Sequence, residues 1–186
     1  MEKKKYEEYA YVLDYLPQGR PSSGRQAFKA EPIVQVVGEA YFTLLEAVVR
    51  VGATFTSHER VYVGKDSREK IENIKGRVSY DELTSAAKSE LPIIIEEMVK
   101  TQEKRAVDFF NNSQAVTPRM HALELIPGIG KKYMWQILNQ REKKPFESFT
   151  DLQTRTEIPD PAKLITKRIL EELMGETKYR IFTRIP

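Results

Sequence analysis

The stretch that decides the fold is LELIPGIGKKYMWQIL, residues 123–138. An apolar segment leads into the turn PGIG at 127–130, and a second apolar segment with helical spacing begins near Lys131. The first backbone N–H groups of that second helix have no partner inside the helix, and they form the positive end of its dipole. Two glycines leave the backbone open to close approach. The stretch therefore predicts an anion site flanked by Lys131 and Lys132.

This order of elements is typical of a helix-hairpin-helix motif, which binds a phosphate backbone with little sequence preference. The alternative is an ordinary pair of helices joined by a glycine turn, because a short PG or GxG turn alone is weak evidence. The longer pattern LxxIPGIGKK, followed by three apolar residues at helical spacing, favours nucleic-acid binding. The predicted nucleic-acid-binding residues are those of the hairpin and three basic residues downstream: Gly128, Ile129, Gly130, Lys131, Lys132, Lys163, Lys167 and Arg168.

A second, degenerate hairpin follows the first. Pro159 lies 32 residues after Pro127, but Asp160 and Pro161 stand where the first hairpin has glycines. Aspartate repels phosphate and proline has no N–H to donate. We therefore expect the second hairpin to complete a four-helix core rather than to bind an anion. The first helix of this tandem domain is predicted to begin at Thr117-Pro118, an N-cap followed by a first-turn proline.

The first 78 residues predict a small OB-like β-barrel. Short runs rich in β-branched and aromatic residues are separated by Gly and Pro turns, as in small antiparallel barrels. These runs are YEEYAYVLDYL (6–16), IVQVV (33–37), AYFTLLEAVVRV (40–51) and RVYVG (60–64). We expect Tyr9, Tyr11 and Tyr15 on one face of the first strand, where they either stack on bases or fill the core, the commoner role of aromatic side chains.

The remaining segments connect and close these parts. Residues 79–116 change to helical periodicity, and Ser79 with Glu82 has the spacing of a capping box, so connecting helices with a scaffolding role are expected. The tail contains KYRIFTRI, which alternates and predicts a strand. The prediction is an α+β protein with four parts: an OB-like β-barrel (1–78), connecting helices (79–116), a (helix-hairpin-helix)2 domain (117–174) and a strand-like tail (175–186).

Composition excludes several function classes. The 186 residues include no cysteine and two histidines, so disulfides, thiolate metal sites and cysteine nucleophiles are excluded, and we expect no metal and no cofactor. The net charge is +3, and residues 117–186 hold 13 basic against 9 acidic residues, as a nucleic-acid footprint would. Because the sequence has no long apolar stretch and no secretory leader pattern, we expect a cytoplasmic protein without a membrane partner.

No catalytic motif accompanies the hairpin. The sequence has neither a Walker A loop nor a G-x-S-x-G elbow. Helix-hairpin-helix glycosylases carry a catalytic aspartate downstream of their hairpin, and Asp151 lies near that position. A short helix capped by Ser148 or Thr150 explains Asp151 as a first-turn acid that interacts with the helix dipole. We therefore predict a protein that is not an enzyme and has no catalytic residues.

The whole chain resembles an archaeal family known as DUF655. The stretches that carry the resemblance are YAYVLDYLPQG, PIVQVVGEAYFTLLE, ERVYVGK, YDELTSAAKSEL, LELIPGIGKK and PFESFTDL. The resemblance implies an OB-type barrel joined to a helix-hairpin-helix domain, binding of RNA or nucleotides, and a place with the translation machinery. RNA is therefore the preferred partner and DNA the second, with ribosome or polymerase components as further partners. The alternative function is a protein-interaction module in a translation or transcription assembly.

Overall fold

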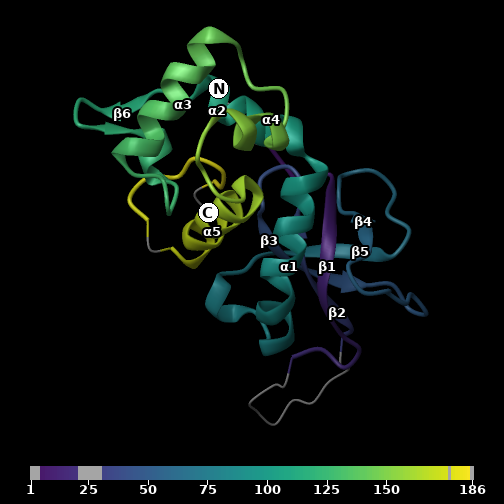
Figure 1. Cartoon of the computed structure of the whole chain (residues 1–186). Coiled ribbons are helices and arrows are strands. Elements are labelled where there is room, and N and C mark those ends of the chain that lie inside the picture. Colours follow the sequence, from purple (N-terminus) through teal and green to yellow (C-terminus); the bar gives the residue numbers. More distant parts are fainter. Residues whose placement is uncertain (1–4, 21–30, 176, 185–186) are drawn as a thin grey trace. The chain divides into compact units, whose positions relative to one another are not determined.

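The computed structural model describes residues 5–20, 31–175 and 177–184, and it has the predicted α+β architecture (Figure 1). The chain divides into two compact units. The first unit comprises Met1–Ile94 with Phe182–Pro186, and the second comprises Ile95–Ile181. This division falls inside a helix, whereas the sequence suggested boundaries after residues 78 and 116. Hydrophobic periodicity marks where helices begin, but it does not show which core each helical turn joins.

The first unit contains an antiparallel five-stranded sheet that curls into a half-barrel. Its strands are β1 (Tyr9–Leu16), β2 (Ile33–Gly38), β3 (Leu44–Val49), β4 (Arg60–Tyr62) and β5 (Ile71–Arg77). Their order in the sheet is β4-β1-β2-β3-β5. The first four strands thus follow a Greek-key order, with β5 added beside β3. Small and β-branched apolar side chains on one face fill the interior, among them Val12, Val34, Val36, Ala47, Val61 and Ile71.

A β-bulge in β1 separates Tyr15 from Tyr9 and Tyr11. The register between β1 and β2 shifts midway along the strand, and side chains beyond such a bulge change face. Tyr15 packs against the barrel interior, and its ring centroid lies 5.3 Å from that of Phe55. Tyr9 lies on the other face beneath the guanidinium of Arg60, 3.6 Å from the ring centroid. The prediction that Tyr9, Tyr11 and Tyr15 share one face is therefore wrong.

The face of β2 opposite the barrel interior is tied to the start of α1 (Ser85–Thr101). The Gln35 side chain donates to Glu46 at 3.2 Å and accepts from the Thr84 N–H at 3.0 Å. Burial alone would raise the pKa of Glu46, but hydrogen bonds from Arg20 and Gln35 outweigh it and hold that pKa below its usual value. The predicted Ser79–Glu82 capping box is confirmed at the preceding 3-10 turn, η1 (Tyr80–Glu82).

The second unit is built mainly from helices. Its elements after α1 are α2 (Glu103–Asn112), β6 (Ala115–Thr117), β7 (Met120–His121), η2 (Ala122–Leu125), α3 (Lys131–Lys143), α4 (Phe149–Arg155) and α5 (Pro161–Met174). Apolar side chains from all of these helices form its core, including Phe110, Leu123, Ile126, Ile137, Leu152 and Ile165. Over the described residues, no helix combines the length and the apolar character needed to cross a bilayer.

The segment before the hairpin differs from the prediction. Thr117-Pro118 does not begin a helix, because Thr117 pairs with Met120 in the short β6–β7 ladder. The helical turn begins only at Ala122, where His121 Nδ1 accepts the Leu123 N–H and Glu124 accepts the His121 N–H at 2.8 Å. The element preceding the PGIG turn is therefore the single 3-10 turn η2 rather than a full α-helix.

The described part of the tail, residues 177–184, contains no strand, contrary to the prediction. Its main chain is instead held by side chains of α5. Arg168 donates to the carbonyl oxygen of Tyr179, and both carboxylate oxygens of Glu172 accept from the Ile181 N–H at 3.1 Å. These two backbone groups of the tail are therefore bonded to side chains rather than to a neighbouring strand.

Candidate nucleic-acid interface

The PGIG turn joins η2 to α3 with a tight, glycine-dependent backbone. The Ile129 N–H donates to the carbonyl of Ile126 at 3.0 Å and closes the turn. Gly128 has a φ of +91°, and a Cβ there would lie 3.1 Å from Cδ2 of Leu164. The positive φ therefore favours glycine at position 128, and a Cβ there would also press on Leu164 of α5. Gly130 is the N-cap of α3, with a φ of −91° that any residue can adopt.

The backbone N–H groups at the start of α3 are available as hydrogen-bond donors. Among the hydrogen bonds of the described residues, none uses the backbone N–H of Gly130, Lys131 or Lys132, and no side chain caps the helix. Gly130 and both lysines are exposed. The positive end of the α3 dipole thus faces solvent with its donors unoccupied.

The neighbouring helices end differently. Ser148 caps α4, as one of the two predicted candidates, by accepting the Asp151 N–H at 3.0 Å. Asp160 caps α5 by accepting the Lys163 N–H at 3.3 Å. An anion at the start of α5 would be repelled by the Asp160 carboxylate, which already occupies the Lys163 N–H. This supports the expectation that the second hairpin is a poor anion site. Of α3, α4 and α5, only α3 begins without a side-chain cap.

Both hairpin lysines form ion pairs with glutamates, and the Lys132 pair is exposed on both sides. Lys131 Nζ lies 2.8 Å from Glu124, and Lys132 Nζ lies 2.7 Å from Glu157. The hydrogen bond from Lys132 lowers the pKa of Glu157, and the same bond raises the pKa of Lys132. Solvent screens an exposed pair such as Lys132–Glu157 strongly, so a phosphate group can replace the carboxylate there at small cost. Both ammonium groups therefore lie beside the hairpin, and a phosphate group can compete with the glutamates for them.

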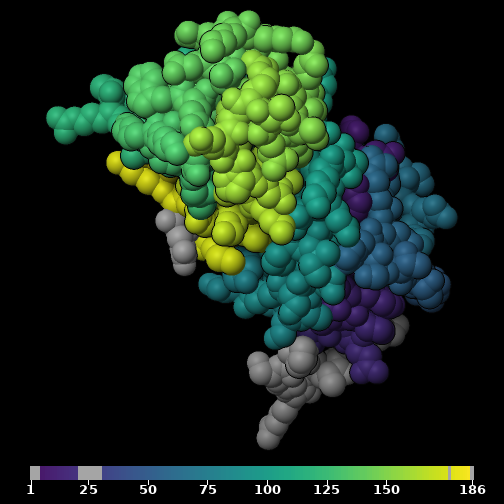
Figure 2. Space-filling model, viewed as in Figure 1, coloured from purple at the N-terminus to yellow at the C-terminus, as the bar shows by residue number. Residues whose placement is uncertain are grey.

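Trp135 and Arg119 extend this surface and were missed in the sequence. Trp135 is 57% exposed and lies one helical turn after Lys131, so the two side chains share a face of α3. Lys131 Nζ also contacts the carbonyl of Arg119 at 3.5 Å, at the tip of the β6–β7 hairpin. Figures 1 and 2 show this hairpin projecting from the surface of the second unit. The sole tryptophan of the chain, four residues after a hairpin lysine, was the available clue.

The three basic residues predicted on α5 divide into two groups. Lys163 and Lys167 are exposed and are one helical turn apart. Arg168 is only 6% exposed, so the prediction that it extends the basic surface is wrong. Its Nε lies 3.0 Å from the fully buried carboxylate of Glu172, and its other nitrogens donate to the carbonyls of Leu125 and Tyr179. Arg168 is a buried link between α5, η2 and the tail.

Ile129 is also not available to a ligand. Its side chain is buried, and its N–H is already bonded to Ile126. Sequence spacing alone could not separate the occupied N–H of Ile129 from the unoccupied one of Gly130. The hairpin residues that remain accessible to a ligand are Gly128, Gly130, Lys131 and Lys132.

Asp151 occupies a structural position at the start of α4. Its carboxylate accepts the Glu147 N–H at 3.0 Å and pairs with Arg155 at 3.1 Å. These contacts, the Glu147 N–H first, hold the pKa of Asp151 below its usual value. The environment matches the first-turn acid predicted from the sequence. Over the described ranges, no group of three or more His, Asp or Glu side chains is arranged to hold a metal ion.

Comparison with known proteins places the whole chain in one family. The model of the family described as "Protein of unknown function (DUF655)" matches residues 6–184. An uncharacterized protein of Methanocaldococcus jannaschii is 45% identical over 183 residues, which cover 97% of this chain and 82% of that protein. A crystal structure of an Archaeoglobus fulgidus protein from the same family superimposes with a TM-score of 0.87 at 50% identity, covering 96% of this chain and 100% of that one. The chain therefore belongs to the DUF655 family.

Proposed function

We propose that this protein is a non-catalytic nucleic-acid-binding protein that holds a phosphate backbone at the Gly128–Lys132 hairpin. The N–H groups of Gly130, Lys131 and Lys132 would donate to phosphate oxygens, and the two ammonium groups would neutralise charge. Trp135 would offer a ring for an unpaired base, a contact worth roughly 1–3 kcal/mol in single-strand binders. RNA is the preferred partner because of the family resemblance.

The observation that carries the proposal is the uncapped start of α3. A Cβ at Gly130 would meet no atom within 4 Å, and its backbone conformation is open to any residue. Neither packing nor conformation therefore requires glycine there, and a Ser, Asp or Asn would cap the helix as Ser148 and Asp160 do elsewhere. Open donors beside two exposed lysines are what a phosphate ligand requires.

The proposal includes the finer fold assignment. The η2–PGIG–α3 segment would be a helix-hairpin-helix unit whose first helix is a single 3-10 turn, with α4 and α5 as its degenerate partner. The Greek-key half-barrel of the first unit would be OB-like, which is a common architecture for binding oligonucleotides.

The first test is RNA affinity as a function of salt for the double variant Lys131→Ala, Lys132→Ala. We expect roughly tenfold weaker binding at low salt, because two charged contacts are lost. The slope of log affinity against log salt should become shallower by about 1.4–1.8, the value for two phosphate contacts.

The matched control is Lys143→Ala, Lys144→Ala, which removes the same charge at the other end of α3 and should change affinity far less. Equal effects of the two double variants would reject the hairpin as the phosphate site. The protein-interaction alternative would be favoured if neither double variant changed the affinity for RNA or DNA and if both still bound a protein partner.

Removing the acidic competitor should strengthen binding. In Glu157→Gln, Lys132 loses its carboxylate partner, while the glutamine oxygen can still accept from Gln136. We expect RNA affinity to rise by about two- to fivefold at low salt, the range for an exposed ion pair. Glu147→Gln, which frees Lys144 at the other end of α3, serves as the charge-matched comparison and should leave affinity unchanged. Equal gains in both variants would mean that only net charge matters.

A further inference from the structure

A pocket of about 300 Å³ lies in the first unit, at the margin of the half-barrel. Its wall comes from three separate segments: the residues before β1, the β4–β5 connection, and the facing parts of β3 and β5. The apolar part of the lining is Leu45, Val63 and Ile74, which belong to or pack against the barrel interior. The pocket is therefore a continuation of the core that is open to solvent, at the lower end of the size range of small-ligand sites.

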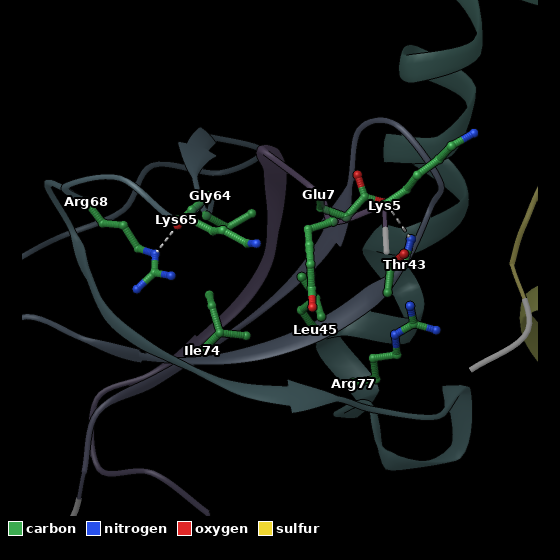
Figure 3. A pocket seen from close by; sticks show the side chains of 11 residues that line it. Lys5, Glu7, Thr43, Leu45, Gly64, Lys65, Arg68, Ile74 and Arg77 are labelled. Atoms are coloured by element: carbon green, nitrogen blue, oxygen red, sulfur yellow. Dashed lines mark hydrogen bonds between the residues drawn. The ribbon is translucent and has the colours of Figure 1, made fainter. Parts of the chain in front are cut away.

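Cations dominate the polar part of this pocket. Lys5, Lys65, Arg68 and Arg77 line it, against the single carboxylate of Glu7. Figure 3 shows Lys65 and Arg68 at one end and Arg77 at the other, with Leu45 and Ile74 between them.

The carboxylate of Glu7 is buried and already accepts hydrogen bonds from the backbone. Glu7 is buried, and its oxygens accept the N–H groups of Ala40 and Tyr41, each at 2.8 Å. It also accepts from the Thr43 N–H at 3.3 Å. Three backbone N–H groups of the β2–β3 turn thus satisfy this carboxylate, and among the described residues it forms no ion pair with the pocket cations. In the described part of the chain, neither Lys65 nor Arg68 forms an ion pair.

Two contacts position the side chains of Arg68 and Lys65 at one end of the pocket. Arg68 Nε donates to the carbonyl of Gly64 at 2.6 Å, which leaves the terminal nitrogens of its guanidinium for another acceptor. The Lys65 ammonium lies 4.5 Å from the ring centroid of Tyr6, which is 56% exposed. A planar ring, an apolar floor and two adjacent cations thus lie within one pocket.

We propose that this pocket binds one nucleotide unit, with the base on the apolar floor beside Tyr6 and the phosphate at Lys65 and Arg68. Aromatic and apolar surfaces accept any base by stacking, and a guanidinium fork matches phosphate oxygens. The site is separate from the hairpin and stands whether or not the hairpin binds. The nucleotide can be a free nucleoside monophosphate or an unpaired nucleotide within an RNA strand.

The test measures binding of AMP, adenosine and inorganic phosphate to the full chain by calorimetry, with Lys65→Glu as the variant. Lys65 is exposed and makes no hydrogen bond among the described residues, so its replacement should leave the fold intact. We expect AMP to bind more tightly than adenosine or phosphate, and Lys65→Glu to weaken AMP binding by about tenfold or more. The control is Lys75→Glu, because Lys75 is exposed and does not line the pocket, so it should change AMP affinity less than twofold.

A second arm separates the two sources of the nucleotide. If wild type binds no free AMP but Lys65→Glu weakens binding of a single-stranded RNA relative to Lys75→Glu, the pocket takes a nucleotide only within a strand. The hairpin variant Lys131→Ala, Lys132→Ala should leave AMP affinity unchanged. The pocket proposal and the hairpin proposal can therefore be rejected independently. The proposal is overturned if wild type binds no AMP and Lys65→Glu and Lys75→Glu bind RNA equally.

Discussion

Replacing Arg168 with alanine is expected to lower the free energy of unfolding by about 3–5 kcal/mol. The variant would leave the fully buried carboxylate of Glu172 without its cation, and it would leave the carbonyls of Leu125 and Tyr179 without their donors. Glu172 would keep the Ile181 N–H, but a buried carboxylate that loses its cation is among the most destabilising changes a core can undergo. Unfolding in denaturant, followed by the fluorescence of Trp135 in the second unit, measures the loss.

Lys167→Ala is the matched control for this prediction. Lys167 precedes Arg168 on the same helix but is exposed, so its removal should change stability by no more than about 0.5 kcal/mol. If Arg168→Ala were as stable as Lys167→Ala, the buried Arg168–Glu172 pair would not be the link that the structure describes.

Gly130→Asp is expected to weaken RNA binding by about tenfold or more while the fold is retained. The new side chain has open space at Gly130 and an allowed backbone conformation, and its carboxylate would cap α3 as Asp160 caps α5. The cap would occupy the donors proposed for phosphate and place a negative charge beside them. Helix stability should stay level or rise, since aspartate is a better N-cap than glycine by a few tenths of a kcal/mol.

Two comparisons isolate the cause of that loss. Gly130→Ser caps the helix without adding charge, so its effect on affinity should lie between wild type and Gly130→Asp. Asn139→Asp adds the same charge at an exposed position later on α3 and should have little effect. Wild-type affinity in Gly130→Asp would show that the start of α3 does not bind the phosphate.

The parts predicted correctly from the sequence depend on local chemistry. The PGIG turn and the Ser79–Glu82 capping box each need only a few consecutive residues, so their residue types were enough, whereas the cap of α4 was narrowed to Ser148 or Thr150 and the structure has Ser148. Thr117-Pro118 shows the limit of this reasoning. Thr117-Pro118 is compatible both with the start of a helix and with a tight turn. The structure has the turn, because Thr117 pairs with Met120 in the β6–β7 ladder.

The errors arose from tertiary structure. Arg168 looked like a surface cation, although it stands four residues after Leu164 and next to Ile169, on the buried side of α5. That helical spacing was a usable warning, but the buried partner Glu172 and the carbonyls it serves become evident only in the structure. The bulge that moves Tyr15 to the barrel interior left no clear mark in the sequence. The pocket around Lys65 could not be predicted, because its wall combines segments far apart in the chain.

The most direct test of the proposed phosphate site is a titration of the ¹⁵N-labelled protein with a single-stranded RNA, observed through its backbone amides. The N–H resonances of Gly130, Lys131 and Lys132 should move strongly, because these donors would acquire phosphate acceptors. The Lys163 amide, already bonded to Asp160, should move little and provides the internal reference. Binding of the RNA with the three α3 amides unmoved would contradict the proposed hairpin site.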